Sequence, residues 1–162
     1  MELVNGACFA LTLAAALGAG VIGGVFFAFS SFVMKALARL PDAHGMTAMQ
    51  AVNVTVLNRS FLGTFLGTGV VCVLTAIAAV LRWHEPGAGL LLAGSVLYLA
   101  GTLGVTVLFN VPRNEALAVV EPEDPNGAAL WAGYVESWTF WNHVRTGASI
   151  GAAAAFTLAL CA

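Results

Sequence analysis

The chain has 162 residues, of which 60% are hydrophobic and 9% are charged, and its formal net charge is -2. A soluble globular domain carries about 25% charged residues, so this composition excludes a soluble domain and indicates an integral membrane protein with a single domain. The few charges form no basic patch, which excludes a nucleic-acid-binding protein.

The first apolar segment covers residues 6–37 and carries no charge between Leu3 and Met34. Roughly 20 apolar residues cross a bilayer core of about 30 Å, so we expect a helix that is tilted or that projects beyond the membrane. The segment is too long for the apolar region of a signal peptide, and no Lys or Arg precedes it. We therefore expect it to be retained rather than cleaved.

A short helix is expected in the loop after this segment. Residues 41–45, Pro-Asp-Ala-His-Gly, are typical of a turn. Met46, Met49 and Val56 then recur at helical spacing, up to about Asn58. We expect this helix to lie at the membrane interface, across one end of the spanning helices.

Three more apolar segments follow, at residues 60–81, 87–109 and 137–161. A tight turn at 83–87 joins the second segment to the third. Pro112 is expected to end the third helix, because proline lacks a backbone N–H and disfavours helical geometry in the residue before it. Four spans predict an all-α protein, a transmembrane four-helix bundle with up-down topology and a short interfacial helix in the first loop.

Most basic residues near the span ends lie on the side of the first and third loops. These residues are Lys35, Arg39, Arg59, Arg113 and Arg145, against Arg82 alone on the other side. Cytoplasmic loops of membrane proteins carry the excess of Lys and Arg. The first and third loops are therefore expected to be cytoplasmic, in the bacterial cytoplasmic membrane.

Small residues in the spans indicate packing rather than chemistry. Gly-x-x-x-Gly pairs begin at Gly20, Gly63 and Gly147, and they fit close helix packing within the bundle or in a homo-oligomer. The three cysteines fall in separate apolar segments without a Cys-x-x-Cys pair or a neighbouring His. We expect no metal site and no disulfide-forming chemistry.

Polar residues gather at the start of the fourth segment. At about 100° per helical residue, Asn142 and Arg145 fall within about 40° of Trp138, whereas His143 lies at roughly 140°. Ionisable groups that face lipid are costly, so we expect this stripe to face a pocket inside the protein, with His143 at its edge. Phe140 falls on the opposite side of the helix.

Each of these residues also fits an ordinary structural role. Arg145 fits a headgroup anchor and Trp138 an interfacial belt, whereas Asn110 and Asn114 fit caps at the end of the third helix. His143 fits a hydrogen-bonded structural histidine. The functional interpretation rests on co-occurrence: two asparagines at one helix end, and Asn, His and Arg at the start of the next helix, on the same side of the membrane.

Several motifs carry a resemblance to a known family. They are residues 109–117 (Phe-Asn-Val-Pro-Arg-Asn-Glu-Ala-Leu), then Trp131, Tyr134 and residues 138–146 (Trp-Thr-Phe-Trp-Asn-His-Val-Arg-Thr), with residues 24–34 and 48–61 in the N-terminal half. Through them the chain resembles the anthrone oxygenase family of small four-span membrane proteins. The resemblance covers nearly the whole chain.

The resemblance implies oxidation of an anthrone to an anthraquinone by O2, without an organic cofactor or a metal. His143 would remove a proton from the activated methylene group, since imidazole accepts a proton near neutral pH; Glu115 is a second candidate base. Arg145 would stabilise the negative charge that develops. The implied substrate-binding residues are Asn110, Asn114 and Asn142, which would hold the substrate oxygens, and Trp138, which would stack on a planar ring.

A non-catalytic membrane module is the alternative function. Such a bundle would bind a lipid, a quinone or a haem held by one axial His, or it would dock as a subunit of a larger membrane complex. A transporter is less favoured, because four spans without an inverted repeat leave little room for an alternating path. The expected partners are membrane lipid, a hydrophobic aromatic small molecule and further copies of the chain.

Overall fold

The computed structural model describes residues 2–162, with side chains from residue 6, and every regular element in this part of the chain is helical. The elements are α1 (Glu2–Ala28), η1 (Phe29–Val33), α2 (Met34–Leu37), α3 (Asp42–Thr55), α4 (Arg59–Leu81), α5 (Ala88–Val96), η2 (Leu97–Gly104), η3 (Thr106–Asn110), α6 (Val111–Ala118) and α7 (Gly127–Ala159). The three η segments are π-helical, with hydrogen bonds between residues five apart. The predicted all-α class is confirmed.

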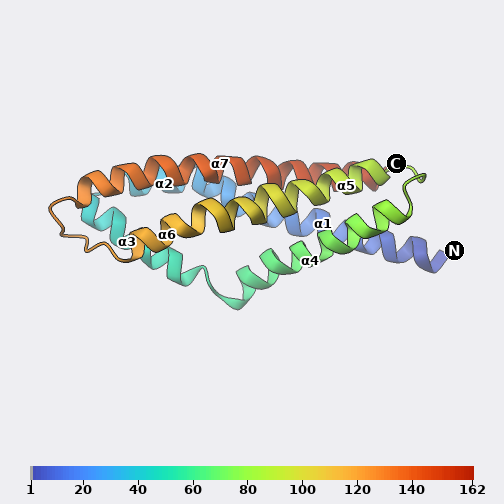
Figure 1. Cartoon of the computed structure of the whole chain (residues 1–162), viewed down its shortest axis with the longest axis horizontal. Helices are drawn as coiled ribbons and strands as arrows, with labels where there is room; N and C mark the ends of the chain where they lie inside the picture. Colours follow the sequence, from blue (N-terminus) through green and yellow to red (C-terminus); the bar gives the residue numbers. More distant parts are fainter. Residues whose placement is uncertain (1) are drawn as a thin grey trace.

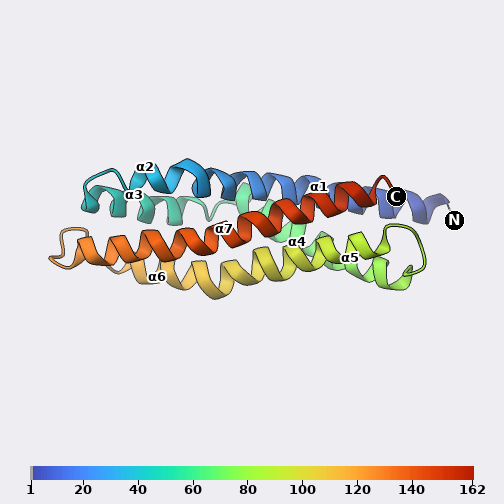
Figure 2. The ribbon, with the colours of Figure 1, turned by 90° about the horizontal axis from the view of Figure 1, so that it is seen from above.

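Long helices run side by side along the molecule (Figure 1). The helix α1 packs against α7 and α4, and α5 packs against the same two helices. Both termini lie at one end of the molecule, and α2, α3 and the loop between α6 and α7 lie at the other end, as Figure 2 also shows. The end with α2 and α3 also holds the start of α7.

Within residues 2–162, three helices are long and apolar enough to cross a membrane: Gly6–Leu37, Arg59–Leu81 and Ala88–Ala118. They indicate a membrane protein and overlap the first three predicted spans. The fourth predicted span, residues 137–161, overlaps α7, which begins and ends earlier than expected and is not one of these three helices. The polar side chains of α7, among them Glu136, Asn142, His143 and Arg145, lower its hydropathy.

The prediction that Pro112 ends the third helix is wrong, because η3 and α6 continue this helix to Ala118. Before the proline, the N–H of Val111 bonds to the carbonyl of Thr106, five residues back. Pro112 then lies in the first turn of α6, where a missing N–H is least costly. The prediction failed because the proline rule assumes an uninterrupted α-helical hydrogen-bond ladder.

Helix α3 confirms the short helix predicted in the first loop, although it begins at Asp42, inside the predicted turn. Its residues Met46 and Met49 are fully buried in a cluster that includes Trp131 of α7. Gly45 lies directly against this tryptophan. A Cβ on Gly45 would be 3.0 Å from the indole ring and 2.7 Å from the carbonyl oxygen of Leu37. The contact between α3 and α7 therefore requires glycine at this position.

Two apolar clusters fill the interior. One joins α1, α4, η2 and α7 and includes Phe26 and Phe65. The other joins α2, α3, α6 and the first half of α7, and includes Trp131 and Trp138. Phe26 and Trp138 lie where the two clusters approach each other, and a buried polar network occupies the space between them.

We predict that Gly45→Ala lowers the stability of the protein. The added methyl group meets the Leu37 carbonyl and the Trp131 ring, and such overpacking costs about 1–3 kcal/mol. Alanine gains only about 1 kcal/mol over glycine inside a helix. Gly133→Ala in α7 is the matched control, since a Cβ there has no atom within 4 Å, and it should raise the stability. Thermal unfolding in one detergent measures both variants, and equal midpoints would contradict the close approach at Gly45.

Candidate functional site

The guanidinium group of Arg145 lies inside the protein, between two aromatic rings. Its Cζ is 4.0 Å from the centroid of the Phe26 ring and 4.9 Å from that of Trp138, and only 6% of the residue is exposed. Its Nε donates to Asn142 Oδ1 at 2.8 Å and its Nη1 to Thr106 Oγ1 at 3.4 Å. Among the described side chains, no Asp or Glu forms an ion pair with it. Arg145 is thus a buried cation that is held by rings and neutral oxygens.

Asn142 fixes the position of this cation. Its Nδ2 donates to the carbonyl oxygen of Phe26 at 2.8 Å and to Ser30 Oγ at 2.7 Å. Both bonds go to the first helical stretch, so the amide oxygen is left facing Arg145. Ser30 in turn lies 3.0 Å from the hydroxyl of Thr146. The same polar network therefore joins α1 and η1 to α7 and orients the guanidinium.

Asn110 is fully buried, and one of its polar atoms lacks a partner. Its Nδ2 donates to the carbonyl oxygen of Trp138 at 3.2 Å, whereas no described residue donates to its Oδ1. Leaving a buried acceptor unpaired costs about 1–3 kcal/mol. Asn110 Oδ1 is therefore suited to accept a hydrogen bond from a bound molecule.

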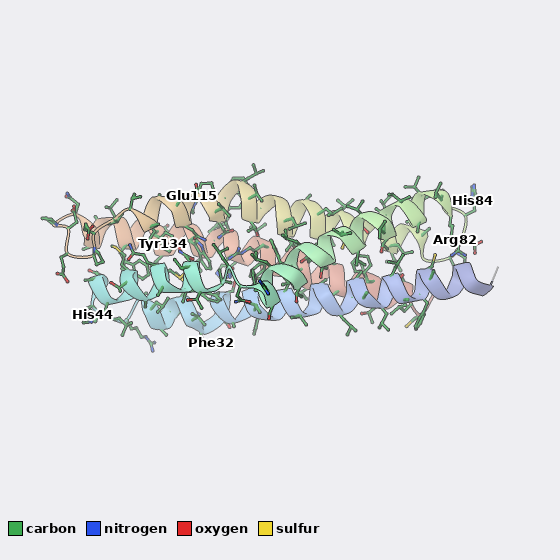
Figure 3. The ribbon with its side chains drawn as sticks, turned by 90° about the horizontal axis from the view of Figure 1, so that it is seen from below. Phe32, His44, Arg82, His84, Glu115 and Tyr134 are labelled. Carbon is green, nitrogen blue, oxygen red and sulfur yellow. The ribbon has the colours of Figure 1, made fainter. Side chains whose placement is uncertain are left out.

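Asn114 accepts two hydrogen bonds beside the Trp138 ring. Trp138 Nε1 donates to Asn114 Oδ1 at 2.8 Å, and the Tyr134 hydroxyl donates to the same oxygen at 3.0 Å. Asn53 of α3 reaches this hydroxyl at 3.5 Å, and Figure 3 places Tyr134 on the side of α7 that faces α3. Burial raises the pKa of the Tyr134 phenol, so it stays a neutral donor. These bonds fix the Trp138 indole next to the cation.

The helical period of α7 explains why these side chains meet. Trp138, Asn142 and Arg145 are buried, as the predicted stripe requires, whereas Phe140 and Val144 on the other side are exposed. In the facing helix, Asn110 and Asn114 are four residues apart and therefore share a face. The two stripes meet at Trp138, which bonds to both asparagines.

His143 lies outside this buried network. Its side chain is exposed and lines a groove of about 320 Å³ on the outer side of α7. Glu115, the second candidate base, is also exposed. The residues that the structure does bring together are Asn110, Asn114, Trp138, Asn142 and Arg145. The two candidate bases, His143 and Glu115, are apart from them.

The sequence analysis missed several residues of the network as site residues, among them Phe26, Ser30, Thr106 and Tyr134. Tyr134 carried a signal, because it lies four residues before Trp138 on the predicted stripe. Ser30 and Thr106 are small hydroxyl residues within long apolar segments, and Phe26 is one of ten phenylalanines. Their part in the site depends on which helices pack together.

The structure offers no evident metal centre in the part of the chain that it describes. No group of three or more His, Cys, Asp or Glu side chains there is arranged to hold a metal ion. Cys8, Cys72 and Cys161 are free. The chemistry of the described site is that of one cation, several amide and hydroxyl groups, and aromatic rings.

The comparisons with known proteins identify the family. No curated protein and no solved structure matches the chain. The family model of the anthrone oxygenases matches residues 54–155, which is more than half of the chain. This stretch includes the α6 and α7 residues of the buried network. The chain therefore belongs to the anthrone oxygenase family.

Proposed function

We propose that this protein oxidises a hydrophobic aromatic substrate of the anthrone type with O2. Membership in the anthrone oxygenase family supports this activity. The observation that carries the proposal is the Arg145 guanidinium, buried between Phe26 and Trp138 with no carboxylate partner among the described residues. Arg145 is the proposed electrostatic catalyst, and His143 is the proposed base.

A buried cation without a counter-ion favours the negative form of any molecule bound beside it. Opposite charges at close range lower the pKa of an acid by about 1–3 units, and each unit corresponds to about 1.4 kcal/mol. Such a charge acts strongly where water is excluded. Arg145 would therefore stabilise the enolate that forms when the methylene group of an anthrone loses a proton. Asn110 Oδ1 would accept a hydrogen bond from a substrate hydroxyl.

The reaction balances without an external reductant. His143 takes one proton from the methylene carbon, and the electron pair of that C–H bond is left on the enolate. The enolate carbon then reacts with O2 to form a C–O bond, which gives a hydroperoxide after proton uptake. Loss of water breaks the O–O bond and the second C–H bond and leaves a carbonyl group. One oxygen atom enters the quinone and the other leaves as water.

The proposed setting is a four-span, up-down bundle in the bacterial cytoplasmic membrane, with the first and third loops on the cytoplasmic side. A membrane location suits both reactants, because anthrones and O2 dissolve in lipid. The Gly-x-x-x-Gly pairs support a homo-oligomer as the proposed assembly. Membrane lipid and the aromatic substrate are the proposed small-molecule partners.

We predict that Arg145→Met lowers catalysed O2 uptake in protein that remains folded. Removing the cation removes the stabilisation of the enolate, and loss of one such group reduces turnover by about a hundredfold or more. The substitution relieves the desolvation of a buried charge but leaves Asn142 Oδ1 without its donor, so thermal unfolding is measured to check that the variant is folded. Purified protein and a dihydroxylated anthrone would be compared in an oxygen electrode, after subtraction of spontaneous oxidation. Unchanged uptake in this variant would exclude the proposed role of Arg145.

We predict that His143→Ala also abolishes most of the catalysed uptake, by about 10²–10⁴-fold for loss of a general base. His84→Ala is the matched control, since His84 is exposed in the α4–α5 loop, at the end of the molecule away from His44 (Figure 3). The control should keep wild-type uptake. Full activity in His143→Ala would discard this residue as the base and direct the search to Glu115.

A further inference from the structure

A groove of about 320 Å³ lies outside the buried network, where α2 packs beside α7. The lining residues that matter here are Met34, Lys35, Ala38, Glu136, Thr139 and His143. Most of the surface that the groove presents is apolar, and its charged groups are Lys35 and Glu136. The groove therefore combines an apolar surface with a few polar groups, as binding sites for hydrophobic ligands do.

Thr139 has a buried hydroxyl group without a partner in this groove. Elsewhere on α7 the hydroxyls bond to the carbonyl four residues back: Ser137 to Gly133, Thr146 to Asn142, Ser149 to Arg145 and Thr157 to Ala153. Thr139 Oγ1 makes no such bond, and no other described residue bonds to it. A buried hydroxyl of this kind is costly unless a ligand or water pairs with it.

Met34 connects the groove to the apolar cluster beside the buried cation. It lines the groove, is only 1% exposed, and belongs to the same apolar cluster as Trp138. The Trp138 ring lies 4.9 Å from the Arg145 guanidinium on its other side. Methionine is unbranched and flexible, so its side chain changes conformation at little cost. A ligand that displaces Met34 would extend from the groove toward Trp138 and Arg145.

We propose that this groove admits the substrate, a planar phenolic aromatic, from the side of the protein and holds it between His143 and Arg145. This inference rests on the proposed function and deepens it. In an anthrone the carbonyl carbon and the methylene carbon occupy opposite corners of the central ring. A base for the methylene and a cation for the enolate oxygen must therefore lie on opposite sides of the bound ring system. His143 lines the groove at one end of this path, and Arg145 lies beyond Met34 and Trp138 at the other end.

The polar groups of the groove suit a hydroxylated aromatic better than a lipid acyl chain. Lys35 attracts a phenolate, Glu136 accepts a hydrogen bond from a phenol, and Thr139 Oγ1 pairs with either. An acyl chain would leave the buried Thr139 Oγ1 without a partner. His143 accepts the methylene proton, and the electron pair left by the C–H bond spreads onto the carbonyl oxygen, on the Arg145 side.

Filling the groove is the direct test. Ala38→Phe places a ring in the groove, whereas Ala36→Phe is the matched control, because both alanines are exposed but only Ala38 lines the groove. The probe is a dihydroxyanthraquinone, which does not react with O2, and its binding to protein in nanodiscs is followed by quenching of tryptophan fluorescence, with empty nanodiscs as background. Ala38→Phe should weaken binding by about tenfold or more, and Ala36→Phe should leave it unchanged.

Thr139→Val is a second, smaller change that keeps the shape of the side chain. Losing one hydrogen bond to the ligand should weaken probe binding by about threefold to tenfold. The Michaelis constant for the anthrone should rise by a similar factor, and kcat should change little. Arg145→Met, by contrast, should lower kcat.

The outcomes separate this inference from the proposed function. Equal binding in Ala38→Phe and wild type would overturn the groove as the entry site, even if O2 uptake is normal. Probe binding that depends on Ala38, without any catalysed uptake, would keep the groove as a binding site and overturn the oxygenase function. An equal loss in Ala38→Phe and Ala36→Phe, or no binding above empty nanodiscs, would overturn the inference.

Discussion

The burial of the Arg145 guanidinium is the constraint on which the rest of the site depends. A cation inside a membrane protein is tolerated only where other groups replace its water. Phe26 and Trp138 supply two ring faces, and Asn142 and Thr106 supply oxygens. These groups come from three different helical stretches, so all three must pack closely for the cation to be stable. Burial of this cation therefore requires the three helical stretches to pack together around it.

Sequence periodicity predicted the part of the site that lies on one helix. The spacing of Trp138, Asn142 and Arg145 places them on one stripe, and this stripe is buried as expected. The same calculation put His143 at roughly 140° from Trp138, and the structure exposes it. The helical period had placed His143 at the edge of the predicted pocket, whereas in the structure its side chain lies outside the buried network.

The rest of the site depends on contacts between helices and on one backbone feature. Nothing in the apolar sequence around Phe26 indicates that this phenylalanine, rather than a neighbouring one, contacts the Arg145 guanidinium. Pro112 was expected to end a helix that in fact continues, because a π-helical turn precedes it. Through this continuation Asn114 remains on the same helical stretch as Asn110 and reaches Trp138. Local sequence patterns predict the helices, whereas tertiary packing determines which helix faces are in contact.

The absence of a carboxylate beside Arg145 in the described structure has a consequence for the end of the catalytic cycle. Under the proposed function, the enolate carries a negative charge, whereas the quinone product is neutral at the oxygen that faces the cation. The guanidinium therefore holds the reacting anion more tightly than the product. When the enolate is converted to the quinone, its attraction to the guanidinium weakens, so the product is bound less tightly than the reacting anion. Product departure into the surrounding lipid would then need no separate conformational signal.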